Sequence, residues 1–263
     1  MSYEHILLSH DGPVTRLTLS DPTRLNAMTP AMGAEIRDAV PLINARDETR
    51  VVIVRGAGRA FSAGGSLKSI QEEVSEDRDA GPGLGGGANF YRLYLSIRDL
   101  EAPSIAAING HAIGAGLCFA LGCDMRVIRT GAQVGMTFVK LGIHPGMAAT
   151  WTLPRLIGPA RAAELLYSGR LIDAATAVEW GIASREAGED FDQVVEDLAL
   201  EIAAAGPIAV KATKRTVRGT FERTLGEALD LESAEQEVTF RTADAREGVQ
   251  ALTERRSPRF EGR

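Results

Sequence analysis

The N-terminal part of the chain combines short apolar runs with turn residues and then shows a helical pattern. Residues Ile6–Ser9 and Val14–Leu19 flank an Asp-Gly-Pro turn, which predicts a β-hairpin. Thr29 followed by Pro30 is typical of a helix start, with threonine as the N-cap and proline at the first helical position. Apolar side chains at helical spacing continue to Ile43. We therefore expect a hairpin followed by an amphipathic helix.

Three later runs are short and almost entirely apolar, as is typical of strands that are buried on both faces. Val51–Arg55 is rich in β-branched residues and ends at a glycine, and Ser104–Ile108 and Met125–Arg129 repeat this pattern. The alternation of strands, loops and helices predicts a layered α/β fold. In such folds ligands gather beyond the strand ends, where glycine-rich loops lead into helices.

From Ala148 onward the pattern is helical, and Gly181 lies where a helix C-terminus would favour glycine. The predicted helices are Ala148–Leu156, Pro159–Tyr167, Asp173–Trp180, Phe191–Ala204, Pro207–Arg218, Leu225–Arg241 and Ala245–Arg255. We expect residues 201–263 to form a helical subdomain that is appended to a core of residues 1–200.

Composition narrows the class of protein. The chain has 263 residues, 44% of them hydrophobic, which suffices for a sizeable buried core. A net charge of −6 argues against a nucleic-acid or anionic-membrane partner, because such partners favour a basic surface. No signal peptide is recognisable, and the uncharged stretch Ala102–Cys123 contains proline, asparagine and several glycines, so we expect no membrane span and a cytoplasmic location. Its two cysteines, Cys118 and Cys123, predict neither a disulfide framework nor a metal site.

Residues Asp79–Asn89 are glycine-rich and contain a formal G-x-G-x-x-G sequence. An acidic segment precedes this sequence where a dinucleotide site would need a strand. We expect a flexible lid or surface loop, and no dinucleotide cofactor.

Two other glycine-rich turns each follow a predicted buried strand. They are Phe61–Lys68 and Asn109–Leu117, and the second runs directly into a predicted helix. Small residues let the backbone approach a ligand closely, and the free N–H groups of a helix start carry positive partial charge. Facing each other, the two turns could form an oxyanion hole. They could equally be simple tight connections between strand and helix.

Five segments occur together in a familiar order and spacing. They are Asp21–Met28, Phe61–Leu67, Ile108–Asp124, Leu141–Gly146 with Leu153–Gly158, and Glu247–Phe260. With these segments the chain resembles the crotonase, or enoyl-CoA hydratase/isomerase, superfamily along almost its entire length. The resemblance implies a spiral of ββα units with a C-terminal helical subdomain, assembled as a homotrimer or a dimer of trimers.

The resemblance also implies a substrate and a mechanism. The substrate would be an acyl-CoA, with coenzyme A as part of the substrate and neither a separate cofactor nor a metal. Its thioester carbonyl would accept hydrogen bonds from the backbone N–H groups of Gly65 and Ala115. Two preorganised donors would stabilise the negative charge of a thioester enolate.

Further positions would contact the rest of the substrate, namely its adenine, phosphates, pantetheine arm and acyl group. By resemblance they are Arg24 and Ala27 for adenine, Lys211 or Lys214 for the phosphates, Ala63 and Leu67 for pantetheine, and Ser66, Phe138, Gly146 and Trp151 around the reacting end.

The chain differs from other members of this family at the positions of their catalytic carboxylates. Hydratases carry two glutamates, and the resemblance puts Cys118 and Phe138 at their positions. Gly146 stands where some isomerases and dehalogenases have an aspartate, and Ser66 where an acid often follows the first turn. Hydration needs an acid and a base, each contributing about 10²–10⁴ in rate. Standard hydratase activity is therefore not expected.

Two side chains remain as candidates for proton transfer. Cys118 would need a lowered pKa, and it is otherwise a small core residue. His144 lies in a loop beside the expected acyl group, where a histidine could act as acid or base, although it could simply bond within its own turn. His111 is expected outside the pocket, and Trp151 would make the pocket more hydrophobic.

Two functions follow from the sequence. The first is an enzyme that acts on acyl-CoA thioesters, with isomerisation, thioester hydrolysis or decarboxylation as alternatives to hydration. The second is a protein that binds acyl-CoA without converting it, since both hydratase glutamates would be absent.

Overall fold

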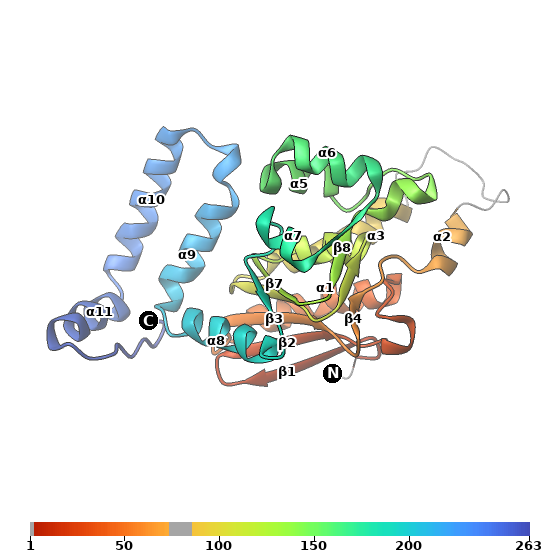
Figure 1. Cartoon of the computed structure of the whole chain (residues 1–263). Coiled ribbons are helices and arrows are strands. Elements are labelled where there is room, and N and C mark those ends of the chain that lie inside the picture. Colours follow the sequence, from red (N-terminus) through yellow and green to blue (C-terminus); the bar gives the residue numbers. More distant parts are fainter. Residues whose placement is uncertain (1–2, 74–85) are drawn as a thin grey trace.

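The N-terminal hairpin and helix form as the sequence predicts. The structure is a computed structural model that describes residues 3–73 and 86–263 (Figure 1). Strand β1 (Ile6–Asp11) pairs antiparallel with β2 (Val14–Leu19). Helix α1 (Pro30–Asn44) begins where the hydroxyl of Thr29 accepts a hydrogen bond from the Met32 amide at 3.2 Å. This N-cap satisfies one of the helix's free amides.

The main sheet has the strand order β1-β2-β3-β5-β7-β10. Strands β3 (Val51–Gly56), β5 (Ser104–Ile108) and β7 (Met125–Arg129) confirm the three predicted buried runs. From β2 onward neighbouring strands run parallel, so the carboxyl ends of β3, β5 and β7 lie at one edge of the sheet. The last strand, β10 (Arg185–Ala187), lies between the predicted helices Asp173–Trp180 and Phe191–Ala204, where no strand was predicted.

A second, smaller sheet was not predicted from the sequence. Its order is β4 (Ala60–Ser62), β6 (His111–Ile113), β8 (Gln133–Gly135) and β9 (Leu171–Asp173). These three-residue strands are too short to show a period along the sequence. The chain passes three times from the main sheet to this sheet and then into a helix. It thus forms the predicted spiral of ββα units.

The remaining helices surround the two sheets. They are α2 (Leu67–Glu73), α3 (Gly86–Leu95), α4 (Ala115–Gly122), α5 (Ala149–Ile157), α6 (Pro159–Ser168), α7 (Ala174–Glu179) and α8 (Phe191–Ala203), with 3-10 turns η1 (Pro22–Arg24), η2 (Ser96–Asp99), η3 (Thr137–Leu141) and η4 (Thr220–Glu222). Of the predicted glycine-rich loop, residues 79–85 lie outside the described residues. Gly86–Asn89 are helical instead, as the first turn of α3.

The main sheet separates two hydrophobic cores. Val52 and Val54 face the larger core, which also contains α1 and α4, while Val51 and Ile53 face the smaller one. This alternation within β3 follows from the two-residue period of a strand. Helix α8 covers the smaller core with Phe191 and its neighbours. Both faces of the sheet are therefore buried, as its apolar strands require.

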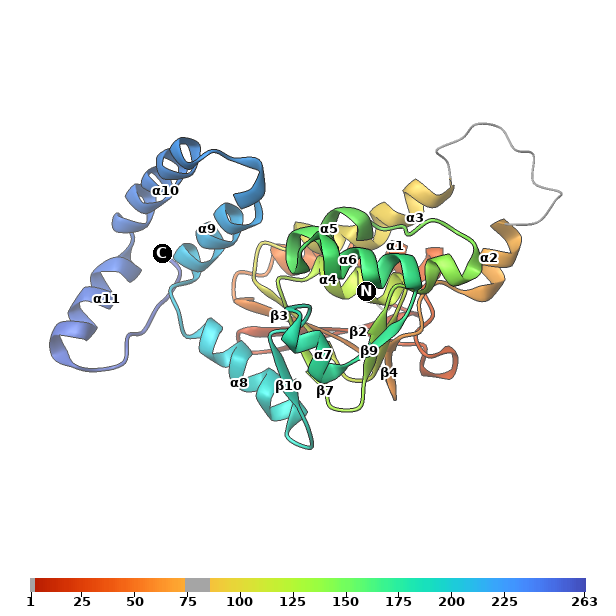
Figure 2. The same ribbon diagram turned by 45° about the horizontal axis from the view of Figure 1, so that its top comes forward.

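Three C-terminal helices project from this body in both views (Figures 1 and 2). We call α9 (Pro207–Arg218), α10 (Leu225–Phe240) and α11 (Ala243–Glu254) the C-terminal arm. The predicted boundary at residue 200 falls inside α8, whose Ala203 still packs in the smaller core. The arm therefore starts after α8.

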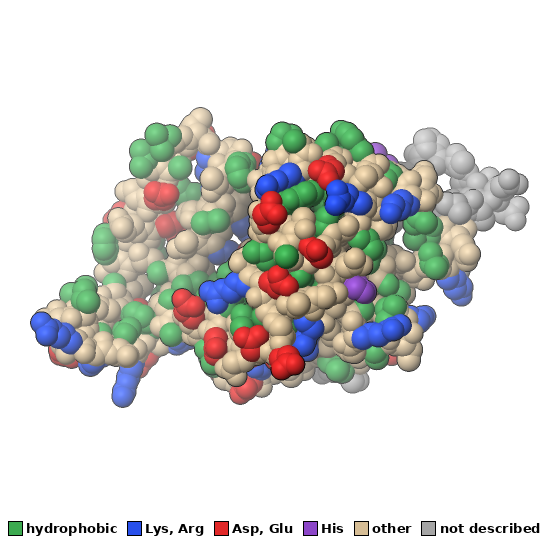
Figure 3. All heavy atoms as spheres, in the orientation of Figure 1, with side chains coloured by type: hydrophobic (Ala, Val, Ile, Leu, Met, Phe, Trp, Pro, Cys, Tyr) green, Lys and Arg blue, Asp and Glu red, His purple; other side chains and the backbone are tan. Residues whose placement is uncertain are grey.

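The arm buries little apolar surface of its own. Helix α10 has no buried residue, and its start is held by a capping box between Thr224 and Glu227. Large apolar side chains remain exposed along the arm (Figure 3). They include Phe221, Leu225, Leu229, Val238, Phe240, Val249 and Leu252. No helix among the described residues is long and apolar enough to cross a membrane.

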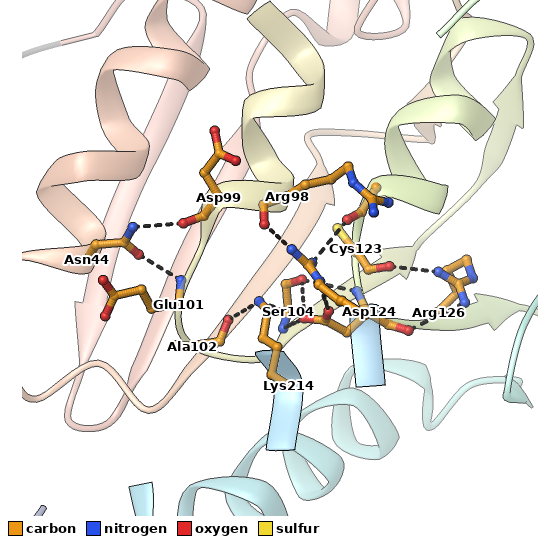
Figure 4. Close-up of polar contacts among 12 residues, drawn as sticks. Asn44, Arg98, Asp99, Glu101, Ala102, Ser104, Cys123, Asp124, Arg126 and Lys214 are labelled. Atoms are coloured by element: carbon orange, nitrogen blue, oxygen red, sulfur yellow. Dashed lines mark hydrogen bonds and ion pairs between the residues drawn. The ribbon is translucent and has the colours of Figure 1, made fainter. Parts of the chain in front are cut away.

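A buried cluster of charges fixes the arm to the body (Figure 4). We call Asp124, Ser104, Lys214 and Arg218 the Asp124 cluster. The carboxylate of Asp124 lies 2.9 Å from the ammonium of Lys214 and 2.8 Å from the guanidinium of Arg218, and it accepts a hydrogen bond from the Ser104 amide at 2.8 Å. Lys214 also donates to the Ala102 carbonyl at 2.6 Å. Every charge of this cluster has a partner.

Candidate functional site

The first glycine-rich turn connects β4 to α2 and leaves one amide without an acceptor. The amide of Ala63 donates to the Leu25 carbonyl at 2.9 Å, and that of Gly64 donates to the Ser62 hydroxyl at 3.2 Å. The amide of Ser66 donates to the Met28 carbonyl at 3.1 Å. Among the described residues nothing accepts a hydrogen bond from the amide between them, at Gly65.

The second turn leads from β6 into α4, and there too an amide is free. Gly114 has a φ of +54°, which favours glycine, and its amide donates to the Gly135 carbonyl at 2.8 Å. The first helical amide, at Ala115, has no acceptor in the described part of the chain. The next bonded amide, at Cys118, donates to the Gly114 carbonyl at 3.1 Å. Free amides at a helix start carry positive partial charge.

The two turns are in direct contact. Strands β4 and β6 pair parallel, so their carboxyl ends lie side by side. A Cβ atom on Gly64 would lie 2.6 Å from the Ile113 carbonyl oxygen and 3.6 Å from the Ala115 nitrogen. A Cβ atom on Gly116 would lie 2.6 Å from the Ser62 carbonyl oxygen. Only glycine fits at these two positions, and their lack of a side chain allows the turns to approach each other.

A buried asparagine holds the segment that carries Arg24 and Ala27. The side-chain amide of Asn26 donates to the Ala57 and Ala60 carbonyls, each at 2.9 Å, and its backbone has a φ of +54°. Ala27 is half-buried, whereas the side chain of Arg24 is 65% exposed and its guanidinium forms an ion pair with Asp21 at 2.7 Å. The turn-forming role of Asn26 was not predicted.

The rim of the first turn is accessible. Ala63 is exposed, Ser66 is half-buried, and the side chain of Leu67 points into solvent at 69% exposure. A single exposed leucine is common on protein surfaces. Its place directly beside the free Gly65 amide is compatible with the predicted contact to pantetheine.

The two lysines proposed for the phosphates differ. Lys214 is only 8% exposed, and its ammonium belongs to the Asp124 cluster. The expectation that Lys214 could reach the phosphates is therefore wrong, because a cation held by a buried carboxylate and a carbonyl is not available to a ligand. Lys211 lies 3.4 Å from Glu101 and is partly exposed, so its predicted role stays open.

The structure gives neither candidate for proton transfer a favourable setting. Burial raises the pKa of Cys118 to about 12, so its thiol is protonated at neutral pH. Its Sγ lies 3.6 Å from the Gly146 carbonyl and 3.7 Å from Met136 Sδ. His144 is exposed, and its Nδ1 lies 2.8 Å from the neighbouring Pro145 carbonyl, the local bond that was the simpler interpretation.

The histidine of the second turn has a structural contact. The Nδ1 atom of His111 accepts a hydrogen bond from the Gln133 amide at 2.9 Å. This bond joins β6 to β8 outside the turn itself. It agrees with the expectation that His111 packs outside the pocket.

A tyrosine that was not predicted lies against Gly146. A Cβ atom on Gly146 would be 2.4 Å from the hydroxyl oxygen of Tyr91, which comes from α3. This hydroxyl has no hydrogen-bond partner within the described ranges. The ring of Phe138 lies 3.9 Å from where a Cβ of Gly114 would be, beside the second turn. No local sequence signal marks Tyr91, because α3 and Gly146 are distant in the chain.

Comparison with known proteins identifies the family. A sequence model of the enoyl-CoA hydratase/isomerase family matches residues 10–263. The chain belongs to this family. It is 38% identical over 233 residues to the "Probable enoyl-CoA hydratase EchA14" of Mycobacterium tuberculosis, covering 89% of this chain and 88% of that protein. It is 34% identical over 261 residues to the 1,2-epoxyphenylacetyl-CoA isomerase of Escherichia coli, covering 98% of each.

Solved structures of the family share the fold. The enoyl-CoA hydratase of Bacillus anthracis superimposes with a TM-score of 0.92 at 33% identity, covering 99% of this chain and 100% of that one. This likeness confirms the predicted crotonase fold and an acyl-CoA enzyme family. Because the relatives are named both as hydratases and as an isomerase, family membership does not select the reaction.

Proposed function

We propose that this protein is an acyl-CoA enzyme that stabilises a thioester enolate between the backbone amides of Gly65 and Ala115. The observation that carries the proposal is the pair of contacting turns, in which the N–H groups of Gly65 and Ala115 lack an acceptor among the described residues. Buried or half-buried amides normally have partners, so two unpaired amides at neighbouring strand ends favour a ligand oxygen there.

The two N–H groups would stabilise the transition state of the reaction. Negative charge grows on the thioester oxygen as a proton leaves Cα or as a nucleophile adds at Cβ. The two N–H groups are part of the folded backbone and need no rearrangement to meet that charge. The start of α4 adds the positive partial charge of its remaining free amides.

Proton transfer is the second part of the proposal. We expect Cys118 and Phe138 to stand where hydratases of the family have glutamates, and a thiol with a pKa of about 12 is a poor base at neutral pH. The free hydroxyl of Tyr91 lies beside Gly146, the position of an acid in some isomerases. We therefore propose Tyr91 as the group that donates or relays the proton.

Replacing Tyr91 by phenylalanine tests this role, since only the hydroxyl is removed. We expect kcat to fall about 100-fold or more while acyl-CoA binding, measured by calorimetry, is retained. Tyr94→Phe is a matched control from the same helix, because the Tyr94 hydroxyl donates to the Thr29 carbonyl at 2.7 Å inside the core. An unchanged kcat in Tyr91→Phe would exclude the role.

The main alternative is a protein that binds acyl-CoA without converting it. The expected absence of the hydratase glutamates favours it, whereas the free amides and Tyr91 favour catalysis. The deciding experiment combines calorimetry with turnover assays on crotonyl-CoA, longer 2-enoyl-CoAs, 3-enoyl isomers, and thioesters that can be hydrolysed or decarboxylated. Binding with no turnover in the whole panel would establish the alternative, and no acyl-CoA binding would refute both.

We also propose that the arm mediates a trimer or a dimer of trimers. The support is the row of exposed apolar side chains on helices that bury almost nothing within the chain. Light scattering after gel filtration should then give three or six times the 28.0 kDa mass of one chain. A monomer at micromolar concentration would contradict this.

A further inference from the structure

A cavity of about 120 Å³ lies between η2, α4 and α5. Most of its wall is apolar and includes Leu95, Leu121, Ala148 and one face of Trp151. Cys118 forms the side nearest the second glycine-rich turn, and Arg98 of η2 is the one charged residue in the lining. An apolar cavity with a single charged group is typical of a site that orients a small ligand.

Arg98 is half-buried, yet its guanidinium has no hydrogen-bond acceptor within the described ranges. Its contact is the ring of Trp151, 5.7 Å from the guanidinium carbon to the ring centroid. Asp124, whose charge acts on Arg98, is already paired with Lys214 and Arg218. In Figure 4 the guanidinium of Arg98 turns away from the Asp124 cluster and carries no dashed line.

Arg126, which is buried, shows how the fold treats an arginine when its role is structural. Arg126 donates to the Cys123 carbonyl at 3.0 Å and also to the Ile182 carbonyl. Arg98 has five N–H donors and no such acceptor. Burial, and then the charge of Arg218, lowers the pKa of Arg98 from its ordinary value, while the charges of Asp124, Asp99 and Glu222 act in the opposite direction. An anion bound in the cavity would supply the hydrogen-bond partner that the guanidinium lacks.

The cavity and the proposed catalytic site both lie along α4. Cys118, Leu121 and Gly122 line the cavity, and they lie about 5 to 10 Å along the helix axis from Ala115, at 1.5 Å per residue. An acyl group whose carbonyl oxygen is bound at the Ala115 amide and which follows this helix would reach the cavity within the length of a short chain.

We propose that this cavity receives the far end of the acyl group and that Arg98 selects acyl chains that end in a carboxylate. The inference rests on the proposed function, because it places the thioester at Gly65 and Ala115. The apolar wall would contact the methylene groups. The planar guanidinium would bind the terminal carboxylate through two parallel hydrogen bonds, an arrangement for which arginine is better suited than lysine.

Calorimetry with saturated thioesters, which have no double bond to hydrate or isomerise, tests this selection without relying on turnover. Each pair has the same chain length and differs only at the far end: butyryl- and succinyl-CoA, pentanoyl- and glutaryl-CoA, hexanoyl- and adipyl-CoA. We expect the carboxylate member to bind about 10- to 100-fold more tightly at the length that reaches Arg98, as for a hydrogen bond to a charged group.

Arg98→Met should abolish that preference and leave the binding of the methyl-ended partner within about threefold, because methionine keeps an apolar stem. Arg155→Met is the matched control. Arg155 lies over the same indole ring, at 4.2 Å, but does not line the cavity, so this variant should keep the preference.

The outcomes separate the inference from the proposed function. If methyl-ended thioesters bind and the carboxylate gives no advantage at any length, the inference is wrong while the function stands; this comparison uses the unmodified protein and does not depend on a variant folding. A preference that survives Arg98→Met would also refute it. If no thioester in the series binds, both proposals fail.

Discussion

The Asp124 cluster and the pair of turns at Gly65 and Ala115 both contain buried or half-buried polar groups, but they differ in how these groups are satisfied. In the cluster each charge has a partner within the chain, from Lys214 and Arg218 to the Ser104 amide. In the turns the amides of Gly65 and Ala115 have no partner among the described residues. Saturated polar groups fix the arm to the body, whereas unsatisfied donors mark where the fold leaves room for a ligand.

The largest effect is expected from removing the carboxylate of Asp124, the centre of the Asp124 cluster. Asp124→Ala should lower the free energy of unfolding by about 3–5 kcal/mol, because it leaves Lys214, only 8% exposed, without its countercharge. Chemical denaturation followed by circular dichroism measures this difference. A loss below about 1 kcal/mol would show that the cluster does not hold the arm.

The next largest effect is expected on catalytic activity, from removing one of the free amides in the two turns. Ala115→Pro removes the N–H group at the first position of α4, where proline is well tolerated in a helix. We expect kcat to fall about 10²–10³-fold, equivalent to about 2.7–4 kcal/mol, with little loss of stability. Steady-state kinetics measures this fall in kcat, with a substrate identified among the acyl-CoA thioesters of the turnover assays.

The matched variant for this test is Ala115→Gly, which keeps the amide. It should lose far less activity than the proline variant. Equal losses in the two variants would argue that the side chain, and not the N–H group, matters at this position.

The saturated cluster should also respond to acid. Burial alone would raise the pKa of Asp124, but the charges of Lys214 and Arg218 outweigh it and hold this pKa below its ordinary value. The stabilisation by this carboxylate is therefore complete above its unfolded pKa of about 3.9 and is lost as the pH falls through the lower folded value. The stability difference between the wild type and Asp124→Asn should shrink only below about pH 4. A difference that shrinks near neutrality would point to another group.

The smallest effect is expected at a neighbouring ion pair on the surface. Glu101→Ala removes the partner of Lys211, whose side chain is 27% exposed while that of Glu101 is 61% exposed. Exposed pairs contribute about 0–1 kcal/mol, so denaturation should detect little change. A loss as large as that of Asp124→Ala would show that burial does not explain the difference between the two lysines of α9.

Much of the main sheet could be predicted from the sequence, because its strands are long enough to show an apolar pattern. Val51–Arg55, Ser104–Ile108 and Met125–Arg129 were all recognised, as was the capped start of α1. The second sheet was missed, since three-residue strands such as β4 and β6 have no detectable period. It is this sheet that brings the two turns together.

The chemistry was less predictable than the fold. The turns were selected from their glycines and from the family resemblance, but that Gly65 and Ala115 have free amides depends on bonds made by Met28, Gly135 and other distant residues. Lys214 was misjudged because a lysine on a helix usually faces solvent, and its pairing with Asp124 crosses much of the chain.

The sequence by itself determined the secondary elements of the main sheet, the helix caps, the glycines of the two turns and the family, because these depend on local conformation and on motifs in order. Only the tertiary structure decided which donors remain unpaired, since that depends on contacts between residues far apart. It also decided that Tyr91 lies beside Gly146 and that Arg98 faces a cavity while Lys214 is buried in an ion pair.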